Sequence, residues 1–247
     1  EDTLRASLRT NWDNNLWAKV VHIICSDRLD GISLNKCCTF LKTITTVKGI
    51  DAYLIVKDIL STSITTRSKT TMICIAKCIA SLCQSDTKCL TQVIQTFSQT
   101  LSVQLDTIQQ QEGKSNAQSN TQSSTQSNTR SLQMALYCLG EIGLTTDLNL
   151  HVSKSHMQQI FLSFQAKDGA LRESSAYCVG NAALSNMAVL LPQILQQAER
   201  SATSSATTAL MCLRTMMTTI NKLASMQSIE IDMSNVSKKK EKNESTV

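Results

Sequence analysis

The feature of this sequence that most constrains its fold is a recurring segment that is apolar or small on nearly every side. Three copies carry a short motif around a cysteine, at 77–80 (KCIA), 137–140 (YCLG) and 177–180 (YCVG). Around each copy, apolar residues recur every three or four positions, which is the period of an α-helix. A helix with so little polar surface needs neighbours on several sides, so these segments are expected to pack against one another.

The spacing of the copies indicates a repeat. The segments 137–140 and 177–180 lie 40 residues apart, whereas 77–80 and 137–140 lie 60 apart. The additional 20 residues match the tract at 109–129, which reads QQQEGKSNAQSNTQSSTQSNT and is too polar to bury a core. A weaker copy, 210–213 (LMCL), places its cysteine 34 residues after that of the third copy. A period near 40 built from two helices is typical of HEAT-type helical hairpins.

We therefore predict an all-α fold, an α-solenoid of about five HEAT-type helical hairpins. The chain has only 7 Gly and 1 Pro, too few turn-forming residues for a sandwich or barrel. Helices are predicted at 14–26, 32–46, 50–61, 68–84, 87–106, 130–143, 154–166, 169–184, 188–199 and 204–225. The expected organisation is a partial first repeat at 1–30, HEAT repeats at 31–108 and 130–226, a disordered polar insertion at 109–129, and a flexible basic tail at 227–247.

Several functional classes find no support in the sequence. The ten cysteines and three histidines lack the spacing of a zinc site, so we expect no metal and interpret the thiols as core residues in a reducing compartment. No Gly-rich phosphate loop, acidic metal-binding pair or His-centred triad is recognisable, so we expect neither an enzyme nor a cofactor or small-molecule ligand. No apolar run of about 18 residues is present, which argues against a membrane span.

The charge of the chain is also informative. Of the net charge of +5, the lysine-rich tail at 238–244 supplies +2, and the remaining +3 is too little for a nucleic-acid-binding surface. Four lysines at a chain end more often keep it soluble, although salt-dependent DNA binding would support a nucleic-acid role. The polar start at Glu1 has no features of a signal peptide and no initiating Met, so we expect either a processed chain or an excerpt of a larger protein, and favour the excerpt.

A protein-binding surface is the remaining hypothesis, because the second helices of a hairpin solenoid line its concave face. Polar positions four apart on the second helices would stack into a strip: Lys77, Ser81, Gln133, Tyr137, Glu141, Glu173, Tyr177 and Asn181. The two tyrosines are candidate interface anchors, but they could instead fill gaps between repeats, and the charged residues could simply be solvated. Gly140 and Gly180 are interpreted as close-packing positions in their helices.

Three stretches resemble a known family in order and spacing. They are 68–83 (SKTTMICIAKCIASLC), 135–148 (ALYCLGEIGLTTDL) and 172–197 (RESSAYCVGNAALSNMAVLLPQILQQ). They resemble HEAT repeats in the C-terminal half of the cullin-associated and neddylation-dissociated proteins. The resemblance extends over about residues 30–225, but the tract at 109–129 and the lysine-rich tail depart from the family pattern.

The resemblance implies a function. Members of this family wrap around cullin–RING scaffolds that lack the ubiquitin-like modifier, compete with the substrate-receptor adaptor, and so act as exchange factors in SCF ubiquitin ligase assembly. This chain would be part of the clasp on the cullin and its RING subunit, in the cytoplasm and nucleus. A different HEAT scaffold, of the transport-receptor or phosphatase-scaffold type, is the alternative.

Overall fold

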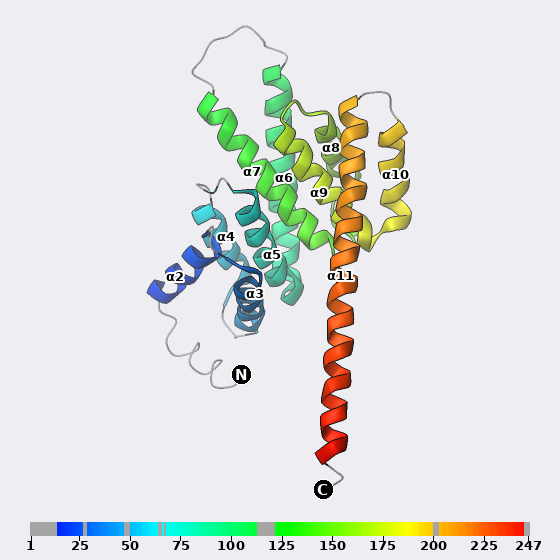
Figure 1. Cartoon of the computed structure of the whole chain (residues 1–247). Helices are drawn as coiled ribbons and strands as arrows, with labels where there is room; N and C mark the ends of the chain where they lie inside the picture. The colour runs from blue at the N-terminus through cyan, green and yellow to red at the C-terminus, as the bar shows by residue number, and fades with distance from the viewer. Residues whose placement is uncertain are drawn as a thin grey trace.

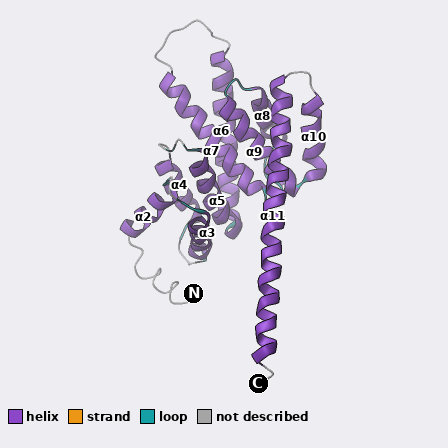
Figure 2. Cartoon of the chain, viewed as in Figure 1, coloured by secondary structure: helices purple, strands orange, loops and turns teal. Residues whose placement is uncertain are grey.

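The computed structural model describes residues 14–26, 29–46, 50–63, 66, 68–112, 122–199 and 203–244. These residues form helices joined by short connections, with no strand among them (Figure 2). The prediction of an all-α fold is therefore confirmed for this part of the chain.

The helices follow the predicted order closely. Their bounds are α2 (Asn14–Ile24), α3 (Gly31–Thr45), α4 (Ala52–Ser63), α5 (Lys69–Ser85), α6 (Thr87–Glu112), α7 (Gln122–Gly143), α8 (Lys154–Leu162), α9 (Gly169–Ser185), α10 (Met187–Glu199) and α11 (Thr203–Glu244). Two short 3-10 segments, η1 (Leu148–Leu150) and η2 (Ser163–Gln165), flank α8.

The helices pack as two layers of a stack (Figure 1). One layer consists of α3, α5, α7, α9 and α11, each of which contacts the next. The other contains α2, α4, α6 and α8, which also contact in order, while α10 packs against α9 and α11. From α2 to α8 in one layer and from α3 to α11 in the other, each helix contacts the helix two positions along the chain, so the arrangement is consistent with an α-solenoid.

Side chains at the helix starts explain several boundaries. Asp30 precedes α3 and accepts a hydrogen bond from the Ser33 amide at 2.7 Å. Asp168 precedes α9 and accepts one from the Ala170 amide at 2.8 Å. These carboxylates satisfy amides of the first turn, which have no partner inside the helix, and so fix where each helix begins.

The recurring motif occupies equivalent buried positions in successive helices. Its cysteines are between 0% and 1% exposed: Cys78, Cys138, Cys178 and Cys212. A Cβ added to Gly140 would lie 3.0 Å from the Cα of Cys178, and one added to Gly180 would lie 2.8 Å from the carbonyl oxygen of Cys212. Each glycine therefore permits close approach of the next helix at its cysteine, as the close-packing interpretation predicted.

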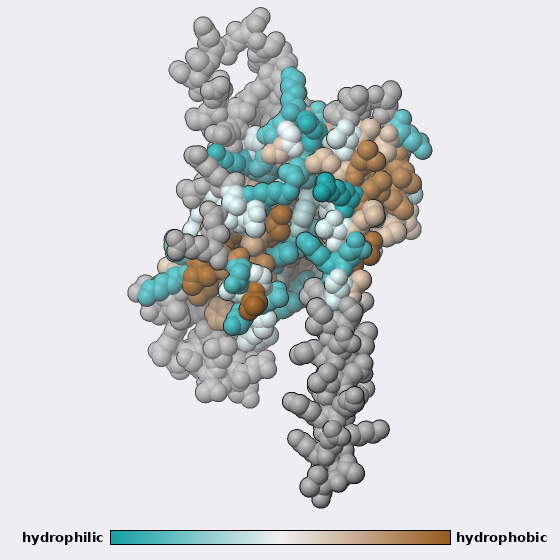
Figure 3. All heavy atoms as spheres, viewed as in Figure 1, coloured by the Kyte–Doolittle hydropathy of each residue, from teal (hydrophilic) through white to brown (hydrophobic). Residues whose placement is uncertain are grey.

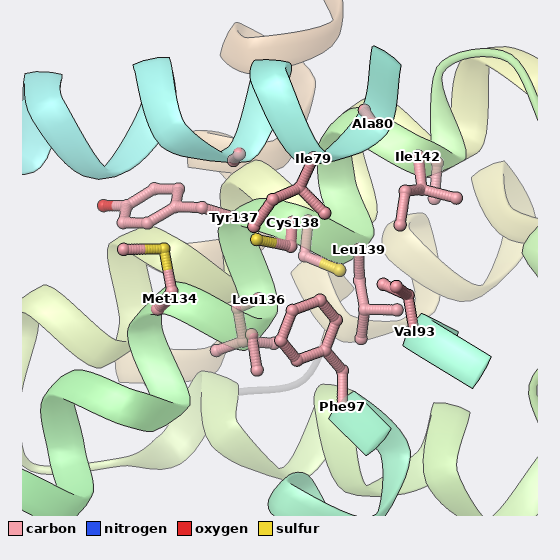
Figure 4. Packing of buried hydrophobic residues seen from close by; sticks show 14 of the residues in the cluster. Ile79, Ala80, Val93, Phe97, Met134, Leu136, Tyr137, Cys138, Leu139 and Ile142 are labelled. Atoms are coloured by element: carbon pink, nitrogen blue, oxygen red, sulfur yellow. The ribbon is translucent and has the colours of Figure 1, made fainter. Parts of the chain in front are cut away.

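The two layers meet in a continuous core. Figure 4 shows Ile79 from α5, with Val93 and Phe97 from α6, converging on Cys138 and Leu139 of α7. All five side chains are buried. Helix α7 contacts α5 and α9 in its own layer and α6 in the other layer. A helix with neighbours on so many sides needs an apolar surface around most of its circumference, which is the sequence feature noted above.

Three helices are longer than predicted. The predictions ended a helix at 106 and began the next at 130, but α6 continues to Glu112 and α7 begins at Gln122. Both ends of the tract expected to be a disordered insertion are thus helical, and residues 113–121 lie outside the described part. Glutamine and glutamate are good helix formers, which accounts for the added end of α6 at 109–112 (QQQE). The added start of α7 at 122–129 (QSSTQSNT) is mostly Ser, Thr and Asn, and its composition does not explain its helix.

The last helix, α11, is also longer than predicted. The predicted helix ended at 225 and was followed by a flexible tail, but the backbone of α11 is helical to Glu244 and projects beyond the other helices (Figure 1). The added segment contains no Gly or Pro and several Glu, Lys and Met residues, which favour helix.

Candidate protein-binding face

The eight predicted contact residues lie on three adjacent helices. Lys77 and Ser81 are on α5, while the other two rows are on α7 and α9. Because α5 contacts α7 and α7 contacts α9, the rows are neighbours in the stack. We call the surface formed by the half-exposed members of these rows the second-helix face; they are Lys77, Gln133, Glu173 and Tyr177.

The other four residues lie between helices rather than on the surface. Their exposed fractions are between 1% and 7%, and they are Ser81, Tyr137, Glu141 and Asn181. A partner protein could not contact such side chains without moving the helices apart. For Tyr137, the alternative interpretation as a residue that fills a gap between repeats fits the structure better than that of an interface anchor.

The two tyrosines link α7 to α9. Their rings are 5.2 Å apart between centroids and inclined at 73°, an edge-to-face arrangement. The hydroxyl group of Tyr177 donates a hydrogen bond to the carboxylate of Glu141. Tyr137 is only 3% exposed, whereas Tyr177 is half-buried. Tyr177 therefore takes part in the contact between α7 and α9 and is also accessible at the surface.

Glu141 is a carboxylate in a mostly apolar setting. Burial raises its pKa above the usual value of 4.5, because a charged carboxylate loses water there. The hydrogen bond from Tyr177 and the positive charges of Lys77 and Lys222 act in the opposite direction and favour the charged form. Burial also raises the pKa of Tyr177, and the nearby Glu141 adds to the shift.

Two further contacts extend this network and were not predicted. The hydroxyl of Thr219 on α11 donates to the side-chain oxygen of Asn181 on α9 at 3.0 Å. At the other end, Lys69 on α5 forms an ion pair with Glu173 on α9, and both side chains are nearly half-exposed. The alignment of Cys212 with the earlier cysteines could have pointed to α11 as a fourth row, but no local signal identifies Lys69.

The chemistry of the second-helix face is that of a recognition surface. Its four members supply one ammonium, one amide, one carboxylate and one phenol group, so the face offers donors, acceptors and one aromatic ring. Figure 3 shows mainly polar colours over the middle of the body, whereas brown gathers over the position of α10 in Figure 1. Exposed apolar side chains on α10 include Met187, Val189 and Leu195.

Metal binding and membrane crossing each require a recognisable structural feature. In the residues with described positions, no group of three or more His, Cys, Asp or Glu side chains could hold a metal ion. Among the described helices, none combines the length and the apolar character needed to cross a bilayer.

Comparison with protein-family models and with curated proteins gives no match to this chain.

Proposed function

We propose that this chain is a scaffold segment that holds another protein along its second-helix face. The observation that carries the proposal is that half-exposed polar side chains of successive helices stand side by side on a firmly connected stack. Beneath them, the ring contact of Tyr137 with Tyr177 and the hydrogen bond to Glu141 tie α7 to α9. A pre-organised surface loses less entropy on binding than a mobile one.

We further propose that the partner is an unmodified cullin together with its RING subunit. This step rests on the family resemblance, in which the chain would contribute to the clasp that regulates adaptor exchange on cullin–RING ligases. Gly140, Glu141, Gly180 and Asn181 are among the residues that carry the resemblance, and all four lie at contacts between helices. They therefore support a shared repeat architecture, while the half-exposed residues would select the partner. Such a partner would place the chain in the cytoplasm and nucleus.

A pull-down with purified cullin–RING complex tests the proposal. The unmodified complex should bind, and the complex that carries the ubiquitin-like modifier should bind weakly or not at all. Equal binding of both forms, or binding of neither, would contradict the choice of a cullin as partner. Binding of neither form would leave a different HEAT-type scaffold as the better hypothesis.

Matched variants locate the contact surface. Glu173→Lys and Gln133→Ala, on the second-helix face, should each weaken binding about 5-fold or more if they lie within the interface. Glu199→Lys on α10 and Gln158→Ala on α8 change the same residue types at exposed positions elsewhere and should have little effect. If the two control variants weaken binding as much as the two variants on the second-helix face, that face is excluded as the binding surface.

A further inference from the structure

A cavity of about 250 Å³ lies where α4, α5, α6 and α7 meet. Side chains from all four helices line it, and the lining is more apolar than polar. The exposed residues Ser61 and Ser131 belong to the lining, so the cavity opens to solvent. None of the four members of the second-helix face lines it. A solvent-accessible hollow in a closely packed stack is a candidate site for a small ligand.

Large apolar side chains form one part of the lining, which we call the cavity floor. They are Met72 of α5, Phe97 of α6 and Met134 of α7, which are 3%, 4% and 7% exposed. Aromatic rings pack well against another ring, and methionine sulfur makes favourable contacts with ring edges. The cavity floor is therefore suited to an aromatic group.

A single cation faces this apolar surface. Arg130 of α7 is half-buried and is the only charged residue among the described residues that line the cavity. Its guanidinium group forms no ion pair with a carboxylate in the described part of the chain. A guanidinium that has lost part of its hydration without gaining a partner favours a carboxylate, which it can bind through two parallel hydrogen bonds.

Hydroxyl groups of the lining are already engaged as donors. Ser63, Thr96 and Thr100 each donate to a backbone carbonyl of their own helix, at distances between 2.8 and 2.9 Å. Because their protons are used within the helices, Arg130 is the strongest donor left for a ligand in the cavity.

The volume of the cavity limits the size of the ligand. An apolar protein cavity of about 150 Å³ holds one benzene molecule. Sites for drug-sized ligands have volumes of about 300–1,000 Å³. A cavity of about 250 Å³ therefore suits one aromatic ring with a short side chain.

We propose that this cavity binds a small arylalkyl carboxylate, whose ring lies on the cavity floor and whose carboxylate pairs with Arg130. The expectation that the chain binds no small molecule came from the absence of catalytic and phosphate-binding motifs. A cavity assembled from four helices has no such local motif, because its lining residues lie far apart in the sequence. The inference does not depend on the identity of the protein partner.

Titration of the full chain with phenylacetate, followed by NMR of isotope-labelled methionine methyl groups, tests the proposal. The ring current of the bound phenyl group should shift the signals of Met72 and Met134, which Met→Leu changes at each position assign. The signals of Met187 and Met217, exposed on α10 and α11, should not move. For a ligand of this size we expect a dissociation constant of about 0.1–1 mM.

A neutral analogue and three variants provide the controls. Phenylacetamide has the same shape without the charge and should bind about 5-fold more weakly or worse. Arg130→Gln should remove this preference for the carboxylate, Arg130→Lys should keep part of it, and Arg214→Gln at an exposed position of α11 should leave it unchanged. Circular dichroism checks that each variant is folded.

Three results would overturn the proposal. The first is the absence of saturable shifts at Met72 and Met134 with phenylacetate at about 10 mM, well above the expected dissociation constant. The second is equal binding of phenylacetate and phenylacetamide to the unaltered chain. The third is a preference for the carboxylate that survives in folded Arg130→Gln.

Discussion

Replacing Gly180 by alanine tests how closely α9 and α11, the last two helices of the layer that begins with α3, approach each other. A Cβ at this position of α9 would lie 2.8 Å from the carbonyl oxygen of Cys212 and 3.0 Å from the Cβ of Thr215, both on α11. The first of these contacts is with backbone, which cannot rotate away as a side chain can. Either α11 must move outward or α9 must distort.

The expected change in the free energy of unfolding is the balance of two opposing effects. Alanine in a helix interior is favoured over glycine by about 1 kcal/mol. Inserting a methyl group into a closely packed contact costs about 1–3 kcal/mol, and a clash with backbone belongs in the upper part of that range. We therefore expect a net loss of about 1–2 kcal/mol, which lowers the melting temperature of a chain of this size by roughly 2–8 °C.

The matched control is Gly31→Ala at the start of α3, where an added Cβ would meet nothing within 4 Å. This change should be neutral or stabilise the chain by a few tenths of a kcal/mol to about 1 kcal/mol. Thermal and urea unfolding, followed by circular dichroism at the helical band, measures both variants. If Gly180→Ala is as stable as the unaltered chain or more stable, the conclusion that α9 and α11 pack closely at Gly180 is contradicted.

Three further predictions concern the polar contacts between helices. Tyr177→Phe removes the donor to the buried Glu141 while keeping the ring contact, and should cost about 1–3 kcal/mol in urea unfolding. The pKa of Glu141 is higher in the folded chain than its unfolded value of 4.5, so its stabilising contribution is complete below that pH and is lost as the pH rises through the folded pKa. Glu141→Gln should therefore become more stable relative to the unaltered chain as the pH rises above 4.5, and a constant difference in melting temperature across that range would contradict the shift. For the exposed pair of Lys69 and Glu173, a double-mutant cycle should give a coupling below about 1 kcal/mol that weakens with salt, and a larger, salt-independent value would refute the assignment.

The sequence contained enough information to locate the helices and their pairing. Apolar periodicity predicted the interior of each helix, because the buried stripe is a local property of the chain. The repeated cysteine predicted which helices are equivalent, and the structure places Cys78, Cys138, Cys178 and Cys212 in equivalent buried positions. The end of α6, the start of α7 and the end of α11 were missed because their polar segments lack the apolar periodicity that marks a helix.

The candidate site was harder to predict because exposure depends on neighbours distant in the sequence. Tyr137 and Tyr177 occupy the same place in the motif, yet only Tyr137 is fully buried. Glu141 reads as a surface charge in a helical pattern, but it is buried and accepts a hydrogen bond from the hydroxyl of Tyr177 in the next repeat. The members of such pairs lie far apart in the sequence, so neither segment by itself indicates the contact.

Lysine footprinting in the presence of the cullin–RING complex tests the central claim most directly. Lys77 of α5 belongs to the second-helix face, and Lys69 on the same helix pairs with Glu173 of that face. Lys154, in contrast, is exposed at the start of α8 in the other layer. We predict that the unmodified cullin–RING complex protects Lys69 and Lys77 from acetylation and leaves Lys154 reactive. The complex that carries the ubiquitin-like modifier should protect none of the three lysines. Unchanged labelling of Lys69 and Lys77, or protection confined to Lys154, would contradict the account.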